Sequence, residues 1–314
     1  MSLSVSNLTK KYGEKVVVDN LNFEINRPGV YALLGTNGAG KTTTLRIILG
    51  MLASNGGSVL WNGKPLDAVS ANVGYLAEER GLYPKYSLLD QLLYFAKLRN
   101  VSKKVAMDRI TYWSDRLQVN EYLFPPKVKG KKTNPKANRA DQLSKGNQQK
   151  IQLMAALISD PELIILDEPL SGLDPVNTDL FKSIIKEEIA KNKYLIMSSH
   201  QMPTIEEFCS DITILNRGKA VLQGNLNEIK RGYGRVNLYV KSDKDIAPYI
   251  AEFGLKIENK TPSEYHLKVQ GEEQAMAFLA KLISEHIPVI KFELREPSLH
   301  EIFIEKVGDA HEKE

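Results

Sequence analysis

The feature that most constrains the fold of this chain is the stretch LLGTNGAGKTTTLRIILGML at residues 33–52, where three glycines fall within six residues. Glycine loses much conformational freedom when it is ordered, so such a cluster needs a reason, and close approach of the backbone to a ligand is one. The preceding run, residues 30–34 (VYALL), is apolar and typical of a buried strand. The residues that follow repeat at helical spacing: Leu45, Ile48, Leu49 and Leu52. The sequence therefore predicts a strand, a glycine-rich loop and a helix in immediate succession.

Residues 35–42 (GTNGAGKT) match the pattern G-x-x-x-x-G-K-[ST] at every fixed position. The backbone N–H groups of such a loop can surround an anion, and the positive end of the following helix strengthens the attraction. Lys41 would supply charge at the β- and γ-phosphates, Thr42 a hydroxyl to Mg2+, and Thr43 a donor to an earlier phosphate. A glycine-rich turn that caps a helix is the alternative, but the strand–loop–helix context favours a nucleoside triphosphate with Mg2+. The predicted binding residues are Gly35, Thr36, Asn37, Gly38, Ala39, Gly40, Lys41, Thr42 and Thr43.

A second predicted strand, residues 163–167, ends in two carboxylates, Asp167 and Glu168. Carboxylates beside an apolar strand are costly to bury unless a cation lies nearby. With a phosphate loop in the same chain, we expect Asp167 on the Mg2+ side and Glu168 as the general base for an attacking water. Two acidic residues that simply end a strand in a turn are the alternative.

Two further segments carry weaker indications of a site. Ser144 and Gly146, in LSKGNQQ at 143–149, stand where a helix begins, and helix N-termini bind anions, although an ordinary capped helix explains the same residues. His200 follows the apolar run YLIMSS. A lone histidine is more often structural, but the carboxyl end of a strand is where open α/β sheets hold their ligands.

The composition suits a large folded protein, because 42% of the 314 residues are apolar. The single cysteine, Cys209, excludes an internal disulfide and suits a reducing compartment. We expect a cytosolic location, since there is no apolar run long enough to span a bilayer and no secretory signal. The formal net charge of +4 is too small to indicate nucleic acid as a partner.

The order of the predicted elements indicates two domains. Short β-prone runs separated by turns occupy residues 3–63, and apolar residues at helical spacing begin at about residue 86. Later in the chain the order β-α-β-β-α-β is typical of a ferredoxin-like α+β domain. The expected divisions are a first domain at 1–232, a helical insertion within it at about 86–145, a second domain at 233–308, and a frayed tail at 309–314.

The segment 125–139 (PPKVKGKKTNPKANR) has six basic residues, no acidic residue and three prolines. It cannot build a core, and we expect a solvated loop. Binding to anionic lipid headgroups or to an acidic partner is the alternative.

Taken together, the motifs resemble those of the ATP-binding subunits of ABC transporters, over about residues 3–230. Residues 35–43 are similar to the Walker A motif, 163–168 to the Walker B motif with its catalytic glutamate, and 143–147 to the signature motif. Residues 171–175 (SGLDP) are similar to the D-loop.

Single residues extend the resemblance. Asp174 matches the D-loop aspartate, His200 the switch histidine, and Tyr12 the aromatic residue that stacks on adenine. The resemblance implies that Lys41, Glu168 and His200 act in catalysis, with ATP and Mg2+ as cofactors.

The resemblance also implies an α/β fold, a P-loop NTPase core with an N-terminal antiparallel β subdomain and a helical insertion. The family forms head-to-tail dimers, here a homodimer or a heterodimer with a related ATPase, in which Ser144 and Gly146 would contact the partner's ATP. A separate membrane permease is implied, which would hold the chain at the inner face of the cell membrane.

Three residues depart from the family's pattern. Lys145 replaces a glycine and Asn147 a glutamine in the signature. Glu78 stands where the family has a glutamine that contacts Mg2+, and a carboxylate is an acceptable ligand for this hard cation. Thr42, Glu78 and Asp167 are therefore the predicted metal ligands.

The predicted function is that of an ATP-hydrolysing subunit that drives export through a separate permease. The segments EERGLYP and LSKGNQQK and the C-terminal domain resemble bacterial exporter ATPases of the sodium-extrusion and drug-exporter type. One alternative is a soluble ABC-type ATPase that acts on ribosomes or nucleic acid. Another is a switch that binds ATP without turning it over, which Glu168 and His200 argue against.

Overall fold

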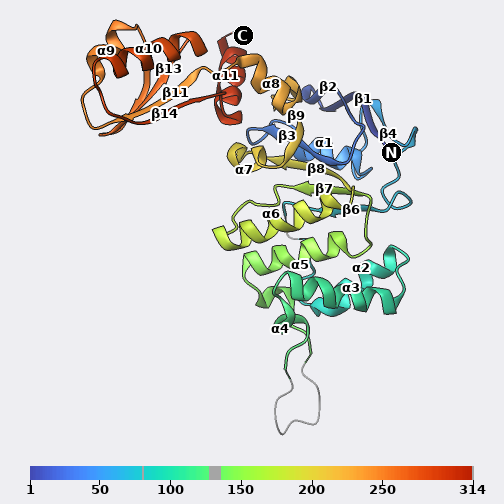
Figure 1. The fold of residues 1–314 in the computed structure, drawn as a ribbon. Helices are drawn as coiled ribbons and strands as arrows, with labels where there is room; N and C mark the ends of the chain where they lie inside the picture. Colours follow the sequence, from blue (N-terminus) through green and yellow to red (C-terminus); the bar gives the residue numbers. More distant parts are fainter. Residues whose placement is uncertain (80, 127–135, 313–314) are drawn as a thin grey trace. The chain divides into compact units, whose positions relative to one another are not determined.

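The computed structural model describes residues 1–79, 81–126 and 136–312, which form two compact units (Figure 1). The first unit comprises residues 1–201 and 207–223, and the second comprises residues 202–206 and 224–314. The division therefore falls at 223/224, whereas the sequence pattern placed a domain boundary at 232.

An antiparallel sheet of the first unit has the strand order β2-β1-β4-β5. Its strands are β1 (Leu3–Tyr12), β2 (Lys15–Ile25), β4 (Gly56–Trp61) and β5 (Lys64–Pro65). In β1 the side chains of Leu3, Val5 and Leu8 are buried, as a half-buried strand requires. Within β2, Asn20 takes a φ of +49° and the pairing with β1 shifts register there, so the strand continues through a bulge.

The second sheet of this unit has the order β10-β9-β3-β8-β7-β6. Its strands are β3 (Gly29–Gly35), β6 (Val73–Leu76), β7 (Leu163–Asp167), β8 (Tyr194–Ser199), β9 (Cys209–Asn216) and β10 (Lys219–Asn225). Strands β6, β7, β8, β3 and β9 pair in parallel. Strands β6 and β9 were not expected from the sequence pattern. Because parallel strands end at one edge, the carboxyl ends of β3, β7 and β8 lie together.

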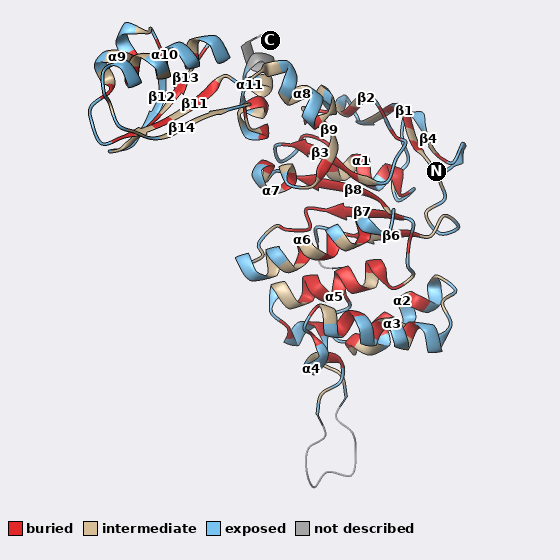
Figure 2. Cartoon of the chain, in the orientation of Figure 1, coloured by how far each residue is buried: buried red, intermediate tan, exposed pale blue. Residues whose placement is uncertain are grey.

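Helix α1 (Lys41–Ile48) packs in a core shared by the two sheets, where Leu45 and Ile48 are buried (Figures 1 and 2). Figure 2 shows that β3, β7 and β8 are buried along their lengths. Continuous burial explains why these three strands are runs of apolar residues rather than alternating patterns.

The expected helical insertion is present between β6 and β7. Its elements are α2 (Leu88–Leu98), α3 (Lys103–Arg116), α4 (Asn120–Leu123) and the short 3-10 helix η1 (Ala140–Gln142). Helices α5 (Lys145–Leu157) and α6 (Pro175–Ala190) follow. Ser87 and Ser102 cap α2 and α3, accepting from Asp90 N and Val105 N. Residues 127–135 of the basic segment lie outside the described residues.

The second unit contains the predicted β-α-β-β-α-β order. Its elements are β11 (Asn237–Ser242), α9 (Ala247–Glu252), β12 (Lys256–Lys260), β13 (Glu264–Lys268), α10 (Glu272–Ser284) and β14 (Val289–Arg295). The sheet order is β12-β13-β11-β14 and the pairs are antiparallel, which is a ferredoxin-like arrangement. Leu238, Val240, Phe278 and Leu282 lie in its core.

Three helices complete the second unit: α7 (Met202–Glu206), α8 (Leu226–Tyr233) and α11 (Leu299–Glu312). The expected frayed tail is thus helical as far as residue 312, and only 313–314 lie outside the described residues. Across residues 1–79, 81–126 and 136–312, no helix has both the length and the apolar character to cross a bilayer.

Candidate site for ATP binding and hydrolysis

The loop between β3 and α1 requires glycine at two positions. Gly35 has a φ of +156°, and a Cβ there would lie 2.5 Å from the carbonyl oxygen of Leu215. Gly40 has a φ of +106°, and a Cβ there would lie 2.5 Å from the carbonyl oxygen of Val17. Both contacts are with backbone, which cannot move aside as a flexible side chain can. The loop is therefore held against its neighbours in a conformation that other residues would disrupt.

Lys41, the first residue of α1, is almost fully buried, with an exposed fraction of 6%. Its Nζ donates hydrogen bonds to the carbonyl oxygens of Gly35 (2.8 Å) and Thr36 (3.2 Å). The same nitrogen lies 3.4 Å from Oε1 of Glu168, as an ion pair. The fold thus brings the lysine of the glycine loop to the acidic residue that follows β7, although the two residues lie far apart in the sequence.

Asp167, at the end of β7, is fully buried. Its Oδ1 accepts hydrogen bonds from Ser198 Oγ (2.5 Å) and Thr42 Oγ1 (3.2 Å). Burial raises the pKa of Asp167, while the hydrogen bonds from Ser198 and Thr42 act in the opposite direction. Among the described residues nothing donates a hydrogen bond to Oδ2. A buried carboxylate oxygen without a donor, beside a threonine hydroxyl, is a donor set that fits Mg2+.

Glu168 has a φ of +48°, which is uncommon for any residue other than glycine. Its Oε2 lies 2.9 Å from Nδ1 of His200, and its backbone N–H donates to Ser198 Oγ at 2.9 Å. With the ion pair to Lys41, Glu168 contacts both of the other residues expected to act in catalysis, at the edge of the sheet. Ser198 was not among the residues expected at this site. Ser198 could have been predicted only from the strand order, because β8 must be the neighbour of β7 for its serine to lie beside Asp167 and Glu168.

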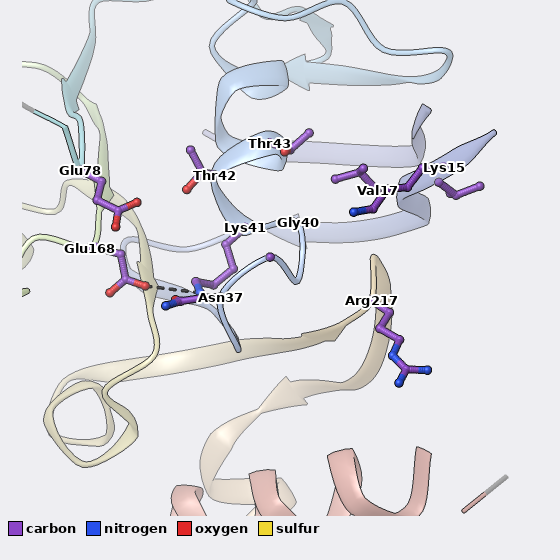
Figure 3. A pocket seen from close by; sticks show the side chains of 12 residues that line it. Lys15, Val17, Asn37, Gly40, Lys41, Thr42, Thr43, Glu78, Glu168 and Arg217 are labelled. Atoms are coloured by element: carbon purple, nitrogen blue, oxygen red, sulfur yellow. Dashed lines mark ion pairs between the residues drawn. The ribbon is translucent and has the colours of Figure 1, made fainter. Parts of the chain in front are cut away.

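A cavity of about 660 Å3 opens over this group (Figure 3). This volume is in the range of small-molecule sites. The residues that line it come from β2, the glycine loop, the start of α1, the segments after β6 and β7, and the turn after β9: Lys15, Val16, Val17, Asn37, Gly38, Gly40, Lys41, Thr42, Thr43, Glu78, Glu168 and Arg217. Figure 3 shows Glu78 beside Glu168, whose carboxylate is joined to Lys41. Basic and apolar side chains thus line one part of the cavity, and the carboxylates of Glu78 and Glu168 line another part together with the glycine loop.

Tyr12 is not among the residues that line this cavity in the described part of the chain. Its side chain is 52% exposed, and the Nζ of Lys10 lies 5.0 Å from the centroid of its ring. The expectation that Tyr12 stacks on adenine therefore stays a prediction. The side chains of Val16 and Val17, which line the cavity, were not singled out from the sequence.

The predicted partner-facing residues lie at the N-termini of two helices. Ser144 caps α5, accepting from Asn147 N at 3.3 Å, and Asp174 caps α6, accepting from Asn177 N at 2.9 Å. Hydrogen bonds from Asn177 and its neighbours lower the pKa of Asp174. A Cβ on Gly146 would lie 3.5 Å from Asn177 Nδ2, so the two helix starts are adjacent. That Ser144 and Gly146 contact the nucleotide of a second subunit stays a prediction, and so does nucleotide binding by the D-loop aspartate, Asp174.

Helix α5 also holds the loops that carry the acidic residues. Gln149 Nε2 donates to the carbonyl oxygen of Pro169 at 2.6 Å, and Gln152 Nε2 donates to that of Glu79 at 3.3 Å. Both glutamine side chains are 9% exposed. The helix that begins at the signature segment is therefore tied to the backbone beside Glu168 and beside Glu78.

A glycine loop before a helix, with carboxylates at the carboxyl end of a parallel sheet, is typical of P-loop ATPases. The family model described as "ABC transporter" matches residues 18–171, and that described as "ATP-binding protein DrrA1-3-like, C-terminal domain" matches residues 224–307.

Similar proteins agree with this class. The ABC transporter ATP-binding protein YhaQ of Bacillus subtilis is 41% identical, covering 99% of this chain and 100% of the relative. The Nod factor export ATP-binding protein I of Paraburkholderia xenovorans is 31% identical, covering 71% of this chain and 70% of the relative. A solved structure of an ATP-binding subunit of an ABC transporter has a TM-score of 0.65 at 26% identity, covering 74% of this chain and 93% of that chain.

The chain belongs to the ABC transporter family as an ATP-binding subunit. It is therefore an ATPase that binds ATP and serves a transporter with a membrane partner. None of the relatives named above supports the alternative of an ATPase that acts on ribosomes or nucleic acid.

Proposed function

We propose that this chain binds ATP with Mg2+ in the 660 Å3 cavity, hydrolyses it there, and drives export by a separate membrane permease. The observation that carries the hydrolysis is the contact of Glu168 with both Lys41 and His200. The export direction is supported by a relative named for Nod factor export. Through the permease, the chain would lie at the inner face of the cell membrane.

In the proposed reaction, Glu168 accepts a proton from the attacking water. His200 contacts Oε2 of that carboxylate and Lys41 is paired with Oε1, so both oxygens of the general base are oriented by neighbouring residues. Lys41 lies on the same side and supplies positive charge where the phosphates would lie. Thr42, Asp167 and Glu78 would hold Mg2+, which when bound neutralises charge on the phosphates.

The dimer is the second part of the proposal. Ser144, Gly146 and Asp174 stand at adjacent helix N-termini, where backbone N–H groups can meet the phosphates of a nucleotide held by a second subunit. ATP would then lie between two copies, or between this chain and a related ATPase. ATP binding would close the dimer and hydrolysis would reopen it. This cycle of closing and opening would change the conformation of the permease.

Two variants test the site. Lys41→Ala removes the buried ammonium group, so we expect binding of a fluorescent ATP analogue to be lost. Glu168→Gln should keep that binding, release phosphate at least about 100-fold more slowly, and form an ATP-dependent dimer in size-exclusion chromatography with light scattering. Glu162→Gln, at the other end of β7, is the matched control. Equal phosphate release by wild type and Glu168→Gln would refute the assignment, and a monomer with ATP would refute the dimer.

The permease is tested by pull-down from membranes with the tagged Glu168→Gln variant and ATP. We expect a protein with several apolar membrane spans to be retained with ATP and lost without it. Retention of ribosomal proteins instead would support the alternative function and contradict the proposal.

A further inference from the structure

We propose that Ser198 is a positioning residue for hydrolysis, which fixes Asp167 and Glu168 together through one hydroxyl group. The inference rests on the proposed function of these two acids. Ser198 would touch neither substrate nor cation. It would act by holding Asp167, the expected Mg2+ ligand, and Glu168, the general base, in a fixed relative position.

The register of the sheet places Ser198 for this role. Strands β7 and β8 are parallel neighbours, and Asp167 is paired with Ser198. The side chain of Ser198 is fully buried. Its Oγ donates to Asp167 Oδ1 at 2.5 Å and accepts from the backbone N–H of Glu168 at 2.9 Å. A hydroxyl has one proton to donate, so its donor is committed to Asp167 and its acceptor to Glu168.

The first hydrogen bond orients the carboxylate of Asp167. Oδ1 is held from two sides, by Ser198 Oγ at 2.5 Å and by Thr42 Oγ1 at 3.2 Å. Two anchors on one oxygen fix the rotation of the carboxylate and leave Oδ2, which has no described donor, available to a cation. Without Ser198 only the longer contact remains, and we expect the carboxylate to rotate more freely.

The second hydrogen bond holds the backbone of Glu168 in an unusual conformation. A non-glycine residue at a φ of +48° is strained, and the conformation persists only where the surroundings hold it. The N–H of Glu168 bonds to a side chain, Ser198 Oγ. Loss of that acceptor leaves a backbone donor without its partner in a buried place, and a relaxed φ would turn the carboxylate away from His200 and Lys41.

The neighbouring residue offers an internal comparison. Ser199 is also on β8 and is 4% exposed. Its Oγ accepts from the backbone N–H of Gln201 at 2.9 Å and reaches neither acid. Replacement of Ser199 by alanine therefore removes the same atoms from a buried site on the same strand without touching the proposed bridge.

The test compares Ser198→Ala with Ser199→Ala in the full chain. For Ser198→Ala we expect kcat for phosphate release to fall about tenfold or more, and the Mg2+ concentration for half-maximal binding of a fluorescent ATP analogue to rise about tenfold. Binding of the analogue in EDTA should stay as in wild type, because the glycine loop is intact. Ser199→Ala should match wild type in all three measurements, and Ser198→Thr, which keeps the hydroxyl, should recover most of kcat.

Several outcomes would overturn the inference. Wild-type kcat and Mg2+ dependence in Ser198→Ala would show that the bridge has no such role. Equal losses in the two alanine variants, or lost binding in EDTA, would indicate general damage to packing. If Ser198→Ala does not fold, Ser198→Cys carries the same test, since it leaves no cavity and weakens both hydrogen bonds. Failure of wild type itself to release phosphate would instead refute the proposed function.

Discussion

Asp167 is a buried carboxylate, and its replacement by asparagine measures how far the buried charge lowers the free energy of unfolding. Its pKa is raised by burial, and the nearby charge of Glu168 raises it further, while the hydrogen bonds from Ser198 and Thr42 and the charge of Lys41 lower it. A raised pKa means that the fold disfavours the charged form. An asparagine of nearly the same shape can keep Oδ1 as the acceptor for Ser198 and Thr42 without carrying the charge.

The expected magnitude follows from two opposing terms. Removal of a buried charge is favourable, but the amide N–H2 that replaces Oδ2 brings buried donors that need acceptors, so part of the gain is lost. We expect Asp167→Asn to raise the free energy of unfolding of the nucleotide-free protein by about 1 kcal/mol, within the range of single stabilising substitutions. For a unit of this size, that corresponds to a rise in Tm of about 2–4 °C.

The assay is thermal unfolding in EDTA and again with Mg2+ and an ATP analogue, together with phosphate release. Asp167→Asn should melt higher than wild type in EDTA, gain less from Mg2+ and nucleotide, and release phosphate at least about 100-fold more slowly. Asp160→Asn is the matched control, because the hydrogen bond from Lys193 lowers the pKa of Asp160 and loss of the charge should lower Tm. A lower Tm for Asp167→Asn in EDTA would refute the reasoning from burial.

Two further predictions concern neighbouring parts of the first unit. Lys193 Nζ donates to Asp160 Oδ1 at 2.7 Å on a partly exposed surface, so Lys193→Met should lower the free energy of unfolding by about 0.5 kcal/mol at pH 7 in urea titrations. Because the folded-state pKa of Asp160 is lowered, this contribution is complete above the unfolded pKa and disappears as pH falls through the folded pKa; a difference that grows toward acid pH would contradict it. Gln149→Leu removes the hydrogen bond to the carbonyl oxygen of Pro169, beside Glu168, and should lower kcat several-fold with KM for ATP unchanged in steady-state assays. A change in KM alone would contradict that role.

The glycine loop and the ends of β7 and β8 could be predicted because local backbone conformation and burial determine which residues occur there. Gly35 and Gly40 occupy positions where a Cβ would collide with backbone. The apolar runs before Asp167 and His200 are typical of strands buried on both faces. Since parallel strands end at a common edge, these residues could be expected near one another without knowledge of the strand order.

Other parts of the fold depend on contacts between segments far apart in the sequence, which local sequence patterns do not predict. Strand β6 (Val73–Leu76) has only four residues, one of them a glycine, and β9 (Cys209–Asn216) begins with polar residues, so neither has a clear strand pattern. The bulge at Asn20 is set by pairing with β1. Ser198 meets Asp167 because β8 is the neighbour of β7, and strand order is a property of the whole sheet.

The left-handed conformation of Glu168 explains how two consecutive acids can serve one site. Successive side chains of a strand point to opposite faces, so in a continued strand Asp167 and Glu168 would face apart. The chain leaves strand geometry at Glu168, where φ is +48°, and the two carboxylates then contact the adjacent residues Thr42 and Lys41. The site at the edge of the sheet therefore depends on the strained conformation of Glu168. The groups that hold this conformation, such as Ser198, are needed for catalysis as well as for folding.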